Sequence, residues 1–209
     1  MNRRLANGYD FISSFYDDIA GLIFGKSLFD AQTFFFSEIP DGGNVLILGG
    51  GSGWILPILF QQKPDINICY IDVSGKMLEL AKKRTYPGGR VQFIQGTEES
   101  IPEDLQFDSV ILNFYVDGFS PAQLPSRLML INASMKKNAT WLVTDFMPTH
   151  QLRHQFIVWL THVFFRILIK HPNKRLAEWW KVFEQTGFVV KKERSWTDGL
   201  IKSLIYSRG

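Results

Sequence analysis

The sequence predicts an α/β fold: a doubly wound, mostly parallel sheet of seven strands, with an antiparallel C-terminal strand and helices on both faces. Short apolar runs alternate with amphipathic stretches over residues 44–146, as is typical of parallel strands joined by helices. A glycine-rich turn follows the first apolar run, in "NVLILGGGSGW". Only Thr197 and Asp198 separate the last two strand-like runs, and so short a link permits only an antiparallel hairpin.

The strands are expected where the apolar runs are continuous, the pattern of strands buried on both faces. These runs are 44–49, 66–73, 90–96, 107–115 and 139–146, followed by the hairpin strands 188–196 and 199–208. Helices are expected at 53–62 in spite of Pro57, at 74–84 with Ser74 as N-cap, at 120–135, and at 173–187 with Gly187 as the C-terminal stop. Residues 9–39 predict one or two amphipathic helices broken near Gly25.

The composition is that of one globular domain spanning 1–209, with a net charge of +3, 45% hydrophobic residues and 21% charged residues. Within it we expect an N-terminal helical cap (1–40), a cofactor-binding core (41–146), a helical insertion or lid (147–175) and a last helix with the hairpin (176–209). Cys69 is the one cysteine, the N-terminus has no apolar secretion segment, and no run of 18 apolar residues occurs. We therefore expect a cytoplasmic location without an ordinary membrane span.

Charge is unevenly distributed along the chain. Residues 1–149 carry a net charge of −4, whereas residues 150–209 carry +7. A basic final third is compatible with an anionic partner or a membrane surface, and also with the solvated face of a helix and two strands. The basic residues are scattered and no separate RNA-binding module is visible, so nucleic acid is not expected as a partner.

The glycine-rich turn favours a cofactor of the nucleotide type. Glycines after a buried strand let a ligand approach the backbone, and the following helix presents its N–H groups. The spacing is Gly49-x-Gly51-x-Gly53, whereas a dinucleotide fingerprint in that frame needs glycine in place of Trp54. A P-loop needs Lys and then Ser or Thr at the end of the loop, where this chain has Gly53, Trp54 and Ile55. Neither alternative fits.

This turn resembles motif I of the class I S-adenosylmethionine-dependent methyltransferases, and the resemblance extends along most of the chain. The stretch "DVSGKMLELAKKR", which begins at Asp72, is similar to the family's segment after the second strand. "QFIQGTEESIP" resembles the third strand with its loop, and "FDSVILNFYVDGF" resembles the fourth-strand motif. The closing hairpin resembles the inserted antiparallel seventh strand of this Rossmann-like fold. The implied cofactor is S-adenosylmethionine.

The resemblance also implies which residues hold that cofactor. Asp72 would accept hydrogen bonds from the ribose hydroxyls, Val73 and Met77 would lie against adenine, and Tyr16 would cap the site. Many members have an acidic residue directly after the third-strand glycine, whereas this chain has Thr97 there and so departs from the family pattern. The implied set is Tyr16, Gly49, Gly50, Gly51, Gly53, Asp72, Val73, Met77, Gly96, Thr97, Asn113 and Phe114, the last two beneath the methionine part.

No catalytic residue can be assigned from the sequence. Methyl transfer from a sulfonium is an in-line displacement in which alignment contributes most, and a general base is needed only for a nucleophile with a high pKa. The weak candidates at strand ends are Tyr115, Asp117, Asp145 and His150. Each has a structural alternative, namely packing against the cofactor for Tyr115, a turn for Asp117, and loop hydrogen bonds for the other two. His150 and His154 share a helix face without a third ligand, so no metal site is expected.

The acceptor pocket depends on the insertion after the fifth strand. From Phe156 to Ile169 it has 11 apolar residues in 14, so its helix must be covered by the protein's own core, a second subunit in a homodimer, or lipid in a peripheral membrane contact. An apolar or amphipathic small molecule, such as a quinone precursor or a lipid, would suit such a lid. After the fourth strand, N6-adenine methyltransferases carry two prolines that are missing from "NFYV" (113–116) in this chain. This difference argues against methylation of a nucleic-acid base. The alternative function is a catalytically inactive S-adenosylmethionine-binding or regulatory protein.

The sequence predicts that segment 151–170 is a helix over the acceptor pocket. Trp159→Ala and Phe165→Ala should then weaken acceptor binding and leave cofactor affinity nearly unchanged. If the helix is core, each truncation should instead lower the free energy of unfolding by about 3–5 kcal/mol, and no apolar ligand should shift the melting temperature of the wild-type protein. If the variants stay folded and the wild-type protein floats with liposomes, the helix binds membranes.

Overall fold

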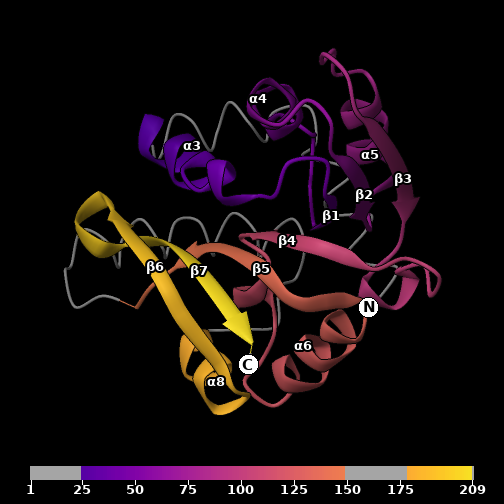
Figure 1. The fold of residues 1–209 in the computed structure, drawn as a ribbon. Coiled ribbons are helices and arrows are strands. Elements are labelled where there is room, and N and C mark those ends of the chain that lie inside the picture. Colours follow the sequence, from indigo (N-terminus) through magenta and orange to yellow (C-terminus); the bar gives the residue numbers. More distant parts are fainter. Residues whose placement is uncertain (1–24, 149–177, 209) are drawn as a thin grey trace.

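The computed structural model describes residues 25–148 and 178–208, which form a seven-stranded sheet in the order β3-β2-β1-β4-β5-β7-β6 (Figure 1). The strands are β1 (Asn44–Leu48), β2 (Asn67–Asp72), β3 (Arg90–Gln95), β4 (Phe107–Asn113), β5 (Met135–Phe146), β6 (Phe188–Trp196) and β7 (Ile201–Arg208). Strands β1 to β5 pair in parallel, and β7 is antiparallel to both β5 and β6. The predicted fold class and the inserted antiparallel strand are confirmed.

Helices cover both faces of the sheet (Figure 1). On one face lie α3 (Lys26–Thr33), α4 (Ile55–Gln62) and α5 (Gly75–Lys82), and on the other lie α6 (Leu124–Ala133) and α8 (Trp179–Gln185). Short 3₁₀ turns are η1 (Phe36–Glu38), η2 (Glu98–Ser100), η3 (Val116–Gly118) and η4 (Thr197–Gly199). A buried cluster with Trp141, Trp179 and Phe183 packs under α6 and α8, and a second with Ile47 and Phe60 packs under α4 and α5.

Local chemistry explains where the helices begin and end. Pro57 is the third residue of α4, where its missing N–H has no intrahelical partner to lose, so the helix tolerates it. Ser74 caps α5 as predicted, since its hydroxyl accepts a hydrogen bond from Met77 N at 3.2 Å. Gly187 follows α8 with a φ of 86°, the left-handed conformation that ends many helices.

Some element boundaries differ from the prediction. β5 begins at Met135 rather than at residue 139, because its first residues pair with β4 across an irregularity that accommodates Asn138 at a φ of 65°. α6 begins at Leu124 rather than at 120, since the Ser120 N–H and hydroxyl bind the Gln123 side chain in a preceding turn. β7 begins at Ile201 because the hairpin link is a 3₁₀ turn through residue 199.

Among the described residues, none of the helices combines the length and the apolar character needed to cross a membrane.

Candidate functional site

The carboxyl ends of β1 to β4 meet at one edge of the sheet, where the chain order reverses. β1 lies between β2 and β4, and the chain leaves β1 towards α4 on one face and β4 towards α6 on the other (Figure 1). Ligands of open parallel sheets bind in the crevice at such a switch point. Except for Tyr16, the predicted cofactor residues all lie in or beside the segments that follow these four strands.

The turn after β1 contains one glycine that borders open space. Gly49, Gly51 and Gly53 have φ values of 67°, 64° and 72°, a conformation that glycine adopts with least strain. Among the described residues, a Cβ added to Gly51 would meet no atom within 4 Å. Gly51 is therefore the position of this turn at which a ligand can approach the backbone.

The other three glycines of the turn are required by packing. The nearest atoms to an added Cβ belong to the Tyr115 ring at 2.8 Å for Gly49, the Tyr70 ring at 2.1 Å for Gly50, and Ala81 at 2.7 Å for Gly53. Side chains there would displace the loop after β4, the core of β2 or the helix α5. The sequence groups four glycines as cofactor residues, whereas the structure separates their roles.

Two side chains that sequence reasoning missed hold the carbonyl side of this turn. The Tyr70 hydroxyl donates to Gly51 O at 3.0 Å. Arg84 donates from Nε to Ser52 O at 3.0 Å and from Nη2 to Ser52 Oγ at 3.2 Å. Tyr70 lies inside an apolar strand, which in the sequence indicates only core, and no local motif connects Arg84 with the turn.

Asp72 lies at the carboxyl end of β2, as predicted, and is 8% exposed. Its Oδ2 accepts a hydrogen bond from Gly51 N at 2.8 Å, and its Oδ1 accepts one from Ser74 N at 2.8 Å. The carboxylate therefore joins the glycine turn to the start of α5. A carboxylate at the end of this strand is also the type of group that accepts hydrogen bonds from ligand hydroxyls.

The residues expected near adenine differ in their exposure and in the hydrogen bonds that they make. Val73 is half-buried, and its carbonyl accepts from Gln95 Nε2 at 3.1 Å. Met77 is 2% exposed, so it presents little side-chain surface. Thr97 caps η2 by accepting from Glu99 N at 3.2 Å. A Cβ at Gly96 would lie 2.1 Å from the Ser100 hydroxyl, so packing within its own loop explains this glycine.

Asn113 and Phe114 lie where β4 ends. Asn113 Nδ2 donates to Gln32 O at 3.4 Å, and its Oδ1 is buried without a hydrogen-bond partner among the described residues. Phe114 has a φ of 51°, and bulky residues adopt that conformation only under strain, which is common at functional sites. These two features distinguish the end of β4 as a place where a ligand could satisfy a buried acceptor.

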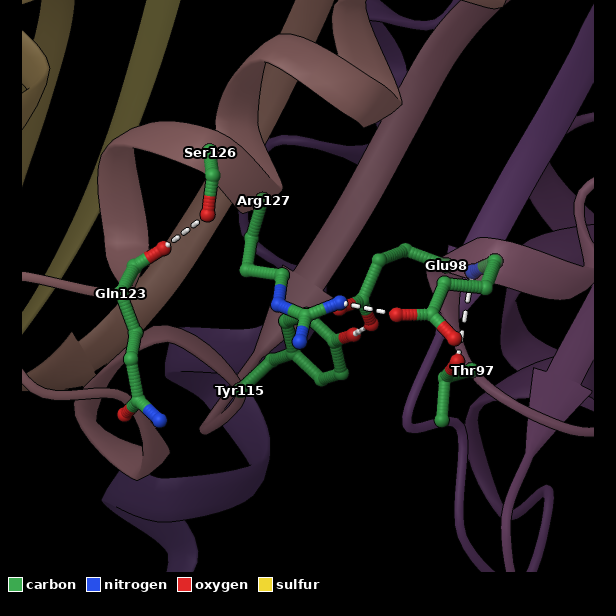
Figure 2. Close-up of polar contacts among 7 residues, drawn as sticks. Thr97, Glu98, Tyr115, Gln123, Ser126 and Arg127 are labelled. Carbon is green, nitrogen blue, oxygen red and sulfur yellow. Dashed lines mark hydrogen bonds and ion pairs between the residues drawn. The ribbon is translucent and has the colours of Figure 1, made fainter.

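A polar cluster joins the loops after β3 and β4 to α6 (Figure 2). The Tyr115 hydroxyl donates to Glu98 Oε2 at 2.5 Å, and Arg127 Nη1 binds Glu98 Oε1 at 2.9 Å and Glu99 Oε1 at 2.6 Å. Burial, followed by the charge and hydrogen bond of Glu98, raises the pKa of Tyr115 well above its usual value. Tyr115 is thus held as a hydrogen-bond donor, which does not suit a general base.

Asp145 holds the loop after β4 rather than facing the crevice. It is fully buried, and it accepts from Val116 N at 3.0 Å, Asp117 N at 3.1 Å and Phe146 N at 2.8 Å. Burial first, and then the carboxylate of Asp117, raise the pKa of Asp145 well above its usual range. Asp117 itself is half-exposed at the crevice edge. Of these two carboxylates, Asp117 is the one that a substrate could reach.

Tyr16, His150, His154 and segment 151–170 lie outside the described residues. Within residues 25–148 and 178–208, no group of three or more His, Cys, Asp or Glu side chains could hold a metal ion.

Several known proteins to which this chain is similar are named as methyltransferases. Residues 45–138 match the family model described as "Methyltransferase domain". Over 152 residues the chain is 26% identical to "Probable inactive O-methyltransferase 11" of Dictyostelium discoideum, covering 72% of this chain and 44% of that protein. Over 110 residues it is 36% identical to the demethylmenaquinone methyltransferase of Thermotoga maritima, covering 52% and 46%. The chain therefore spans less than half the length of these curated relatives.

A solved structure shares the fold. The 1,6-didemethyltoxoflavin-N1-methyltransferase of Burkholderia thailandensis, with bound 1,6-didemethyltoxoflavin and S-adenosylhomocysteine, superposes with a TM-score of 0.66 at 15% identity, covering 96% of this chain and 86% of that one.

The two adjacent glycines of the turn should respond differently to alanine. Gly50→Ala should lower the free energy of unfolding by about 3 kcal/mol, because its Cβ overlaps the buried Tyr70 ring. Gly51→Ala should cost only about 1 kcal/mol, since it meets no neighbour and pays only for its positive φ. Urea unfolding of both variants measures the difference. Equal losses would show that Gly51 is not the open position.

Asp145→Ala should lower the free energy of unfolding by about 3 kcal/mol or more, since it leaves the N–H groups of Val116, Asp117 and Phe146 without their acceptor. The exposed Asp104 is the matched control, and Asp104→Ala should stay within about 0.5 kcal/mol of wild type. Denaturant unfolding compares them. An Asp145→Ala protein as stable as wild type would show that the loop after β4 does not depend on this carboxylate.

Proposed function

We propose that this chain, whose residues 45–138 match the family model described as "Methyltransferase domain", transfers the methyl group of S-adenosylmethionine to a small, apolar or amphipathic acceptor. The observation that carries the proposal is the pairing of Gly51, beside open space, with the Asp72 carboxylate 2.8 Å from its backbone nitrogen. This pairing combines a bare backbone with a charged acceptor at the switch point of the sheet, where nucleotide-type cofactors bind.

The residues of the crevice fit the cofactor in their chemistry. Asp72 would accept hydrogen bonds from the ribose hydroxyls through its carboxylate oxygens. The buried Oδ1 of Asn113 would accept from a donor on the methionine part. When bound, S-adenosylmethionine supplies a methyl group on a sulfonium, an electrophile that needs no metal. The chain's own contribution is to align the two reactants and exclude water, worth up to about 7–11 kcal/mol of the barrier.

The acceptor side of the crevice is aromatic. Phe114 and Phe146 are half-buried, with ring centroids 4.8 Å apart, and Met147 follows at the end of β5. These side chains would favour an apolar acceptor such as a quinone precursor or a lipid. The names of two similar proteins, a demethylmenaquinone methyltransferase and a methyltransferase of the heteroaromatic 1,6-didemethyltoxoflavin, support a small-molecule acceptor. Peripheral membrane contact and a homodimer remain proposals that depend on segment 151–170.

The described side chains favour an acceptor whose nucleophile ionises readily. Tyr115 is a donor to Glu98, and Asp145 is enclosed by backbone N–H groups. Asp117 remains the reachable carboxylate among the described candidates, and we propose it as the base where the acceptor requires one.

A second candidate function is cofactor binding without catalysis. One similar protein, from Dictyostelium discoideum, bears the name "Probable inactive O-methyltransferase 11". Incubation with methyl-labelled S-adenosylmethionine and a panel of quinone precursors, fatty acids and aromatic heterocycles separates the two functions. Labelled product supports the enzyme, and cofactor binding without product from any acceptor class supports the inactive form.

The wild-type chain should bind S-adenosylmethionine and S-adenosylhomocysteine with a Kd in the micromolar range, about −8 kcal/mol, and should not bind NAD. Asp72→Ala and Asp72→Asn should each weaken binding at least about tenfold, because each removes a charged acceptor of ribose hydroxyls. Asp72→Ala should also be less stable, since Gly51 N and Ser74 N lose their acceptor. Titration calorimetry measures the Kd, and a temperature of 15 °C limits unfolding of the less stable variants.

The matched control is Asp65→Ala, a charge change in the exposed turn that precedes the same strand, which should leave the Kd unchanged. Tight NAD binding without S-adenosylmethionine binding, or folded Asp72 variants with wild-type affinity, would contradict the proposed site.

A further inference from the structure

Tyr115 connects two loops that the sheet keeps apart. It follows β4, whereas Glu98 follows β3, and β1 and β2 lie between those strands. At a spacing of about 4.8 Å per strand, β3 and β4 are about 14 Å apart. The hydroxyl nevertheless donates to Glu98 Oε2 at 2.5 Å. The side chain therefore crosses the end of β1, where its ring lies against Gly49, 2.8 Å from the position of an added Cβ.

The acceptor of this hydrogen bond is a buried charge. Glu98 is 3% exposed, and its second oxygen binds Arg127 Nη1 at 2.9 Å. Arg127 belongs to α6, so the cluster joins the loop after β3, the loop after β4 and the helix below them (Figure 2). Removing one partner of a buried carboxylate strongly destabilises a protein, because the charge is left uncompensated. Arg127 and Tyr115 together therefore fix where Glu98 lies.

We propose that Glu98, Tyr115 and Arg127 form a positioning unit, here called the crevice bridge, that sets the affinity for the adenosine end of the cofactor before the cofactor arrives. The proposal rests on the proposed function. None of the three is assigned a contact with the reacting atoms. Arg127 holds Glu98, Glu98 holds the Tyr115 hydroxyl, and the ring holds Gly49, the first residue of the turn that Asp72 anchors.

The physical basis is preorganisation. With the bridge intact, the glycine turn and the loop after β3 are already held at a fixed separation, so binding does not have to order them. The raised pKa of Tyr115, caused by burial, by Glu98 and also by Asp72, keeps its hydroxyl protonated as the donor. Without the bridge, ligand binding has to order these loops, and the affinity for the cofactor is lower as a result.

The test is a double-mutant cycle with S-adenosylhomocysteine as the probe, measured by calorimetry on the full chain. Tyr115→Phe keeps the ring and removes the hydroxyl, and it should weaken binding about tenfold, the size of one charge-assisted hydrogen bond. Arg127→Met should do the same, and Arg127→Lys should recover most of the affinity. The double variant Tyr115→Phe/Arg127→Met should bind S-adenosylhomocysteine at most about twofold more weakly than either single variant, because both substitutions disrupt the same unit.

Glu99→Gln is the matched control. Glu99 also binds Arg127, but its side chain is 61% exposed and it does not contact Tyr115, so this variant should keep wild-type affinity. Melting curves without ligand show whether each variant is folded, and if Arg127→Met is not, Glu98→Gln takes its place in the cycle.

Wild-type affinity in folded Tyr115→Phe, or losses that multiply in the double variant, would overturn the bridge and leave the proposed function intact. A wild-type chain that binds neither S-adenosylmethionine nor S-adenosylhomocysteine would overturn both.

Discussion

The candidate site depends on one carboxylate and the two backbone groups that it joins. Asp72 accepts from Gly51 N through one oxygen and from Ser74 N through the other, each at 2.8 Å. Ser74 in turn caps α5. The end of β2, the glycine turn and the start of the helix thus share one anchor. A buried carboxylate requires such donors, and because both are main-chain groups, the anchor is set by the fold itself.

The crevice is bounded by hydrogen-bonded groups on both sides of that anchor. On the α5 side, Tyr70 and Arg84 bind carbonyl groups of the turn. On the α6 side, the crevice bridge holds the ring of Tyr115 against Gly49. The turn is therefore restrained at its start, at its middle and along its carbonyl groups, while the backbone at Gly51 stays accessible. A rigid frame around one open position is what low-cost binding of a ligand requires.

The sequence predicts elements whose signal is local and misses roles that depend on distant neighbours. The apolar runs, the cap at Ser74 and the short hairpin link are local, and the fold class followed from them together with the family resemblance. The spacing of the glycines is also local, but only Tyr70, Ala81 and Tyr115 reveal which glycine is needed for packing. Nothing in the sequence pairs Glu98 with Arg127, because the two are joined only by the winding of the sheet.

The end of α3 is held by hydrogen bonds from three strands. The carbonyl of Ala31, in the last turn of α3, accepts from Thr144 Oγ1 at 3.2 Å and from Ser203 Oγ at 2.6 Å. The next carbonyl, of Gln32, accepts from Asn113. The end of α3 is thereby fixed to β4, β5 and β7 together.

Asn113 connects two parts of this region: its amide nitrogen donates to Gln32 O at the end of α3, and its buried oxygen, which has no partner among the described residues, would accept from the cofactor of the proposed function. Since one planar amide carries both groups, a shift of α3 necessarily reorients the acceptor offered to the cofactor. Under the proposed function, acceptor preference and cofactor binding would therefore be physically linked through the end of β4.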